Sequence, residues 1–222
     1  MVFRDEYALL IVLFLMVIVG CREEKRYHDK VQRQKVDTPS DALQEILDFQ
    51  AGLNREFRDP ETSPLPDRYR KSFEGLDFFA PDTAYRVRAR LVRTPEALPF
   101  LMPTTTDRTS KEVVYGIVTF SLHGKNHRLE IYQNPELILE DGYADYLFLP
   151  FTDRTNGDQT YMGGRYLDLR IPKSDTIVLD FNKAYNPYCV YNKKYSCPLV
   201  HGVNALGARI LAGVKDFEPK TK

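Results

Sequence analysis

Hydrophobic and polar residues alternate along several segments of the chain, and this pattern predicts β-strands. From Tyr85 to Leu91, apolar residues take every other position and arginines take the positions between them, which predicts a strand with one solvated face. Residues 112–122 and 128–132 predict two strands joined by a turn over 123–127. The Asn156-Gly157 pair predicts another turn. The remaining predicted strands cover residues 146–151, 166–171, 176–181 and 205–211.

A segment with helical spacing precedes these strands. Thr38 suits the cap of a helix that begins at Pro39, and apolar residues recur at helical intervals as far as Phe57. The Asp59-Pro60 pair ends this pattern, and residues 67–73 predict a second, shorter helix. N-terminal helices followed by strands predict an α+β, β-rich fold, either an antiparallel sandwich or an open barrel of about seven to nine strands.

The first residues have the pattern of an export signal. The nearly unbroken apolar run from Tyr7 to Val19 is shorter than the roughly 18 apolar residues that a membrane-spanning helix needs, and it suits a secretory signal. The run leads to Ile-Val-Gly and then Cys21, an ending that resembles the lipobox of bacterial lipoproteins. We therefore expect a signal peptide over 1–20 and lipidation of Cys21. The acylated protein would be anchored to a membrane of the bacterial cell envelope, periplasmic or surface-exposed.

The rest of the chain divides into a tether, one domain and a tail. Residues 21–37 carry many charges of mixed sign without apolar periodicity, which predicts a flexible tether. Residues 38–214 suffice for one domain with its own core, and residues 215–222 form a tail that is expected to fray. The chain has 31 Lys and Arg against 31 Asp and Glu. This balance offers no general attraction to nucleic acid, which is not expected as a partner.

The sequence patterns of common catalytic and metal sites are absent. The chain has no G-x-S-x-G elbow, P-loop, dinucleotide-binding glycine motif, HExxH or C-x-x-C. His123 and His127 are four residues apart, as in helical zinc sites, but they flank a Gly-containing turn instead of lying on a helix, and no glutamate follows His123. The oxygen-rich segment 152–158 departs from the calcium-loop pattern because Arg154 takes a ligand position. No metal site is predicted, and no particular cofactor is indicated.

Two cysteines in the last part of the chain allow two interpretations. Cys189 and Cys197 can close a short loop through a disulfide, worth about 2.6 kcal/mol by the chain-entropy formula. Alternatively, Cys189 acts as a nucleophile or metal ligand near Asp180 and His201. The expected export to an oxidising compartment favours the disulfide.

Polar residues gather in segment 163–197, around an irregular loop that follows a predicted strand. Loops held over a sheet often carry binding and catalytic residues. In one interpretation these side chains satisfy backbone groups of the loop. In the other they form a pocket for a small polar or sugar-like ligand. A hydrolase alternative uses Asp180 as base or metal ligand, Arg165 to stabilise an anion, and Tyr185 beside them. The candidate residues are Asp153, Arg165, Tyr166, Asp180, Asn182, Tyr185 and Asn186.

Several separated motifs resemble one family. The stretches TNGDQTYMGGRYLDL and DFNKAYNPYCVYNKKYSCPL, with SPLPDRYRKSFEGLDFF and FLPFTDRTNG upstream, resemble the uncharacterised prokaryotic family known as domain of unknown function 1684 (DUF1684). The resemblance extends from about the first predicted helix to Val214, where the family tends to show a glutamate one position before its last lysine. It implies a shared fold and no particular activity. The expected function is therefore a ligand-binding or scaffolding module of the envelope, with the hydrolase as the alternative.

Overall fold

The structure is a computed structural model that describes residues 39–218. The predicted signal peptide, Cys21 and the tether lie outside this range. Within it, no helix is long and apolar enough to cross a membrane. The helices and strands are α2 (Pro39–Arg58), α3 (Asp67–Arg70), β1 (Arg86–Arg93), β2 (Phe100–Pro103), β3 (Thr109–Leu122), β4 (Lys125–Gln133), β5 (Tyr146–Phe151), β6 (Arg165–Arg170) and β7 (Thr176–Asp180).

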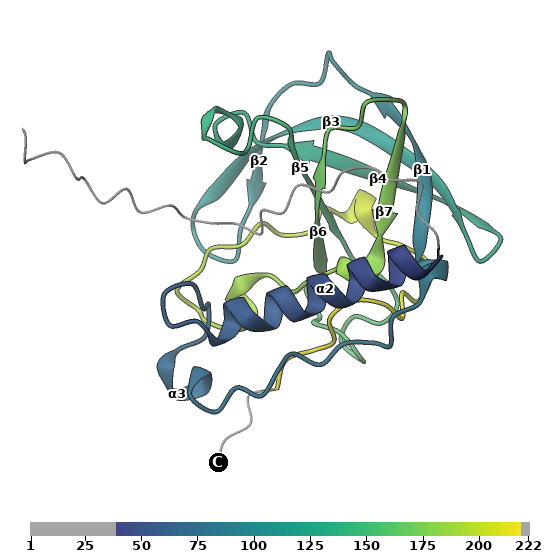
Figure 1. The fold of residues 1–222 in the computed structure, drawn as a ribbon. Helices are drawn as coiled ribbons and strands as arrows, with labels where there is room; N and C mark the ends of the chain where they lie inside the picture. The colour runs from purple at the N-terminus through teal and green to yellow at the C-terminus, as the bar shows by residue number, and fades with distance from the viewer. Residues whose placement is uncertain (1–38, 219–222) are drawn as a thin grey trace, which may run out of the picture.

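The strands form one antiparallel sheet that curls into a nearly closed barrel (Figure 1). Their order is β6-β5-β4-β3-β1-β7, and the short β2 pairs with the first part of β3. β1 pairs with β7 from Arg86, opposite Asp180, to Arg90, opposite Thr176. The predicted β-rich open barrel is therefore confirmed.

The β3–β4 hairpin has a tighter turn than the sequence predicted. Its two turn residues, His123 and Gly124, have φ angles of 48° and 73°, which is the combination that matches the twist of the flanking strands. A register shift between Val114 and Gly116 places a bulge in β3. A Cβ atom at Gly116 would lie 2.7 Å from the carbonyl oxygen of Val92, so the close approach of β1 requires glycine.

The sheet buries side chains on both of its faces. Inside the barrel, apolar residues from all the long strands form one core, including Ala89, Val118, Leu129, Leu147, Leu167 and Leu179. On the outer face, a second and more aromatic cluster includes Phe57, Tyr132, Tyr146, Phe148, Tyr166 and Tyr185. All six residues of β5 are buried, because its alternate side chains belong to the two clusters.

The helix α2 lies across one end of the barrel (Figure 1). Its buried face includes Ile46, Leu53 and Phe57, and the Phe57 ring contacts Tyr191 at 4.7 Å between centroids. The sequence predicted this helix from Pro39 to Phe57, within one residue of the observed end. The second predicted helix is present only as the four-residue α3.

The predicted last strand, 205–211, is wrong. This segment is partly buried and bends at residues 207–208, and its bridge to a neighbour is the isolated one between Thr152 and Ala205. Its backbone bonds to residues 152–154 only at Leu206 and Ala208, and the Ile210 carbonyl beyond the bend accepts from a buried arginine. Backbone hydrogen bonds continue past the predicted end of the domain, because Asp216 N–H donates to Gln159 at 3.0 Å.

Candidate functional site

The structure places Asp153 and Arg165 together in the interior. Both side chains are fully buried, and a guanidinium nitrogen of Arg165 lies 2.8 Å from Asp153 Oδ2. Arg165 also donates to the carbonyl oxygens of Ile210 at 3.0 Å, Ala212 at 2.5 Å and Val214 at 3.2 Å. Burial lowers the pKa of Arg165, and the Asp153 carboxylate opposes that shift. The pair therefore attaches the C-terminal segment to β6 and has no surface left for a ligand.

Asp180 and Asn182 are likewise used in local structure. Asp180 Oδ1 accepts hydrogen bonds from the N–H and the side-chain amide of Asn182, and Oδ2 accepts one from Arg86 at 3.0 Å. The side chain of Asn182 both accepts from Asp82 N–H and donates to Asp82 carbonyl. These bonds join the end of β7 to the segment before β1.

The Asn186 side chain is only partly hydrogen-bonded to the surrounding structure. Its amide nitrogen donates to the carbonyl of Lys215 at 2.9 Å, while its side-chain oxygen has no hydrogen-bond partner among residues 39–218. Of the seven candidate residues, Tyr166 and Tyr185 are the two that line a hollow of the molecule. The structure thus divides the predicted cluster instead of bringing it together.

The hollow lies on the outer face of the barrel, where β3, β5 and β6 are covered by the loop after β7. Its volume is about 240 Å³. Aromatic rings form a large part of its wall and are contributed by Tyr143, Tyr146, Phe148, Tyr166, Tyr185, Tyr188 and Tyr195. Polar side chains interrupt that wall at Thr104, Arg108, Thr109, Ser110, Glu112, Asn134 and Ser196. We call this the tyrosine-lined pocket.

Glu112 is the buried acid of the tyrosine-lined pocket. The residue is only 3% exposed. One carboxyl oxygen, Oε1, accepts hydrogen bonds from Ser110 at 2.7 Å and Asn134 at 3.4 Å. The other, Oε2, has no partner within the described part of the chain. Burial raises the pKa of Glu112, and the bonds from Ser110 and Asn134 only partly offset that effect.

The bulge in β3 determines which face Glu112 occupies. After the bulge, Val118, Phe120 and Leu122 point into the barrel core. Strict alternation would put Glu112 on that same inward face, but the extra residue shifts the register. Val114, two positions after Glu112, accordingly packs in the outer cluster. The carboxyl group therefore faces the pocket and avoids the apolar core.

Asp168 orients two tyrosines of the pocket wall. The hydroxyls of Tyr146 and Tyr185 both donate to its Oδ1, at 2.7 and 2.6 Å. Burial, followed by the nearby Asp168 carboxylate, raises the pKa of Tyr185 well above its usual value. Tyr166 donates its hydroxyl to the carbonyl of Pro198 and exchanges backbone hydrogen bonds with Tyr185. The rings are therefore held in fixed positions and remain neutral donors.

The two cysteines lie at the edge of the pocket. Both are present as thiols; Cys197 is one of its lining residues, and Cys189 N–H donates to the Cys197 sulfur at 3.2 Å. A hydrogen bond from Cys197 lowers the pKa of the Cys189 thiol to about 7. The pairing of these cysteines in a disulfide stays a prediction. No cluster of three or more metal-ligating side chains occurs in residues 39–218.

Chemically, the tyrosine-lined pocket can hold a small molecule between aromatic faces and supply one acidic group to it. Sequence reasoning found Tyr166 and Tyr185 but missed Glu112, which it placed at the start of a strand without a special role. The available signal was a charged residue at an alternate position of an otherwise apolar strand. The bulge that gives this residue its direction left no recognisable mark in the sequence.

Comparisons with known proteins agree with this fold. The model of the family described as "Protein of unknown function (DUF1684)" matches residues 71–215. The chain is also similar to the solution NMR structure of an uncharacterized protein from Haloarcula marismortui. The two are 32% identical, with a TM-score of 0.62, and the match covers 79% of this chain and 95% of that chain. No curated protein matches the chain.

Proposed function

The chain belongs to the DUF1684 family, and from that premise we propose that it is a binding module for a small polar ligand, held at the bacterial cell envelope by a lipidated Cys21. The tyrosine-lined pocket is the binding site. The observation that carries the proposal is the unpartnered Oε2 atom of Glu112. A buried carboxyl oxygen without a partner costs about 1 to 3 kcal/mol, so a ligand that donates to it recovers a loss already present in the free protein.

The wall chemistry defines the ligand further. Fixed tyrosine rings offer flat apolar surfaces, and the polar groups of Ser110, Glu112 and Asn134 converge at one side. Sugar rings combine an apolar face with hydroxyl donors, which suits this division of the wall. The volume of about 240 Å³ lies below the roughly 300–1,000 Å³ of sites for drug-sized ligands, so a single sugar unit or a molecule of that size is expected.

The binding proposal has more support than the hydrolase alternative. That alternative depends on Asp180 and Arg165. The Asp180 carboxylate is engaged by Asn182 and Arg86, and both terminal guanidinium nitrogens of the fully buried Arg165 are engaged by Asp153 and backbone carbonyls. Tyr185, its third residue, faces the tyrosine-lined pocket. A hydrolase built on these three residues would require them to converge on one substrate.

Ligand binding can be tested by thermal denaturation with a panel of monosaccharides and amino sugars, including glucosamine and N-acetylglucosamine. At least one member should raise the melting temperature in a saturable way. The variant Glu112→Gln should weaken that ligand about tenfold or more, because one hydrogen bond to a charged group is worth about 1.5 to 3 kcal/mol. Native mass spectrometry of the chain purified from its host provides a second search for a retained small molecule.

A matched control is available at Glu96, an exposed acid outside the pocket. Glu96→Gln makes the same chemical change and should leave ligand affinity unchanged. Equal loss in both variants would point to a general charge effect. A panel without any saturable shift, together with an empty native spectrum, would refute the binding function.

The envelope location is supported by the apolar run before Cys21 and by the charged segment that follows it. Growth with an alkyne-labelled fatty acid should label the wild-type protein and leave Cys21→Ser unlabelled. Mass spectrometry should show an acylated N-terminal cysteine at position 21. An unprocessed N-terminus in the membrane fraction would contradict lipid anchoring.

A further inference from the structure

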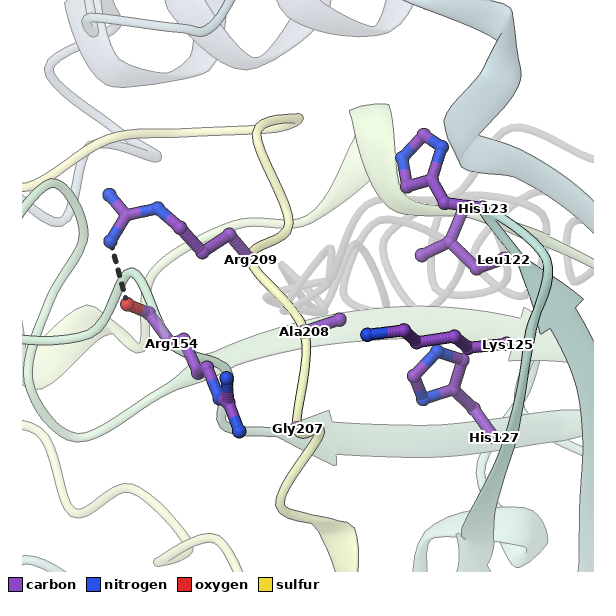
Figure 2. A pocket seen from close by; sticks show the side chains of 8 residues that line it. All are labelled: Leu122, His123, Lys125, His127, Arg154, Gly207, Ala208 and Arg209. Carbon is purple, nitrogen blue, oxygen red and sulfur yellow. Dashed lines mark hydrogen bonds between the residues drawn. The ribbon is translucent and has the colours of Figure 1, made fainter.

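A second hollow lies at the tip of the β3–β4 hairpin (Figure 2), and it shares no lining residue with the tyrosine-lined pocket. Its volume is about 460 Å³. The hairpin forms one side, and the loop after β5 together with the segment 207–209 forms the other. Leu122 and Ala208 are its apolar lining residues, and five basic side chains complete it: His123, Lys125, His127, Arg154 and Arg209. We call it the basic pocket.

The positive charges of the basic pocket are only partly neutralised. Arg209 forms an ion pair with Asp158 at 2.7 Å and donates to the carbonyl of Arg154. Lys125 and Arg154 make no ion pair within residues 39–218, and no carboxylate lines the hollow. In Figure 2, Lys125 extends from the hairpin toward Ala208, while the guanidinium of Arg154 lies near Gly207. Two uncompensated cations therefore approach the same backbone segment from different sides.

Neutral hydrogen-bond donors accompany these cations. The backbone N–H groups of Gly207, Ala208 and Arg209 have no hydrogen-bond acceptor in the described part of the chain.

His127, which also lines the hollow, has an unsatisfied ring nitrogen. Its ring stacks on Phe120 at 5.5 Å, and its buried Nε2 has no hydrogen-bond partner among residues 39–218. Burial, followed by the nearby Lys125, lowers the pKa of His127, so the ring is neutral near pH 7 and contributes hydrogen bonding instead of charge.

We propose that Lys125, His127 and Arg154 bind a phosphate group in the basic pocket, with the backbone of residues 207–209 contributing further donors. A phosphate group has several strong acceptor oxygens and up to two negative charges, which two uncompensated cations and neighbouring neutral donors can match. The group belongs either to a soluble phosphate ester or to the headgroup of an anionic lipid. The site is separate from the tyrosine-lined pocket, so it stands or falls independently of the proposed function.

The test uses the full-length chain in detergent, with ¹³C-labelled histidine. The chain has four histidines, so the spectrum is simple, and the exposed His201, which does not line the hollow, serves as an internal reference. Inorganic phosphate is titrated at constant ionic strength against chloride. The His127 signal should shift and saturate with phosphate, while the His201 signal stays in place.

Two variants identify the residues responsible. Lys125→Gln and Arg154→Gln should each weaken phosphate binding about tenfold, since a charged hydrogen bond of about 1.5 kcal/mol corresponds to that factor. Both side chains are exposed, so the fold should tolerate the changes. Arg90→Gln removes the same charge from an exposed position on β1 outside the pocket, and it should leave affinity unchanged. A non-saturating shift, or equal losses in Arg90→Gln, would overturn the proposal.

Two further titrations distinguish the source of the phosphate. Glycerol 3-phosphate represents a soluble ester, and short-chain phosphatidylglycerol below its micelle concentration represents a lipid headgroup. Tighter binding of the first assigns a soluble ester, and tighter binding of the second assigns a lipid. Absence of saturable binding by either compound and by inorganic phosphate overturns the proposal.

Discussion

Replacing Arg165 tests the conclusion that the Asp153–Arg165 pair is structural. Arg165→Met removes the guanidinium and leaves the Asp153 carboxylate buried, with the carbonyls of Ile210, Ala212 and Val214 deprived of their donor. Breaking a buried ion pair by removing one partner costs about 3 to 5 kcal/mol. That cost is a large fraction of the roughly 5 to 15 kcal/mol by which domains are stable.

Asp153 moderates this loss, because its Oδ1 also accepts hydrogen bonds from Thr155 and from Ile210 N–H. The double variant Asp153→Asn with Arg165→Met removes the stranded charge. It should therefore be less destabilised than the sum of the two single variants.

Urea denaturation followed by circular dichroism measures these free energies of unfolding. If Arg165→Met does not fold, Arg165→Lys keeps the charge but loses the planar fork, and it should still unfold more readily than wild type. Arg90→Gln, at an exposed position, should stay within about 0.5 kcal/mol of wild type. A loss below about 1 kcal/mol in both Arg165 variants would refute the structural role.

Three further predictions concern other buried groups. Burial raises the pKa of Glu112 above its usual value of 4.5 in the folded protein, so the stability that its protonated form contributes is full below pH 4.5 and is lost as the pH rises through the folded pKa. Urea denaturation at pH 4.5 and 7 should therefore show that the stability of Glu112→Gln increases relative to wild type at the higher pH. A difference in unfolding free energy that is the same at both pH values would contradict the shift. Asn204→Ala removes three side-chain hydrogen bonds, to Glu130 N–H, Glu130 carbonyl and Pro150 carbonyl, each 2.8 Å long. It should lower the free energy of unfolding by about 2 to 4 kcal/mol in the same assay. Replacement of its exposed neighbour, Val203→Ala, should change that free energy little. In the reduced protein at pH 8, iodoacetamide should modify Cys189 before Cys197, since the Cys189 pKa is about 7 and that of Cys197 is raised; peptide mass spectrometry identifies the modified site. Thiol counting on the unreduced, denatured protein tests the predicted disulfide, and finding both cysteines as free thiols would exclude it.

Periodicity was informative wherever one face of an element is buried. The α2 helix and the strands β1, β3, β4 and β5 have clear one-sided or fully apolar patterns, because apolar burial imposes the period of the backbone on the sequence. The short β2 has no such pattern and was not predicted. The segment 205–211 has a similar apolar content and was wrongly predicted as a strand. Its chain bends at residues 207–208 and its Ile210 carbonyl bonds to the Arg165 side chain, and a hydrophobic pattern contains no record of where backbone hydrogen bonds go.

The candidate site was predicted less well than the fold. Asp and Asn side chains were selected for their chemistry, yet the same residue types bond readily to nearby backbone, as Asn182 does with Asp82. Composition alone does not separate these two uses. Tyr166 reaches the pocket from β6, and Tyr185 reaches it from the loop after β7, which pairs with Tyr166. Glu112, in contrast, depends on a bulge that only the three-dimensional register reveals.

The pairing of β1 with β7 has a consequence for the time course of folding. The two strands lie about ninety residues apart in the sequence, and pairings of such separation must overcome a large loss of chain entropy before they stabilise anything. The addition of β7 to the sheet is therefore expected late, after the local β3–β4 hairpin has formed. An exported chain with this order of events would remain loosely folded for longer, which is the state that a narrow translocation channel accepts.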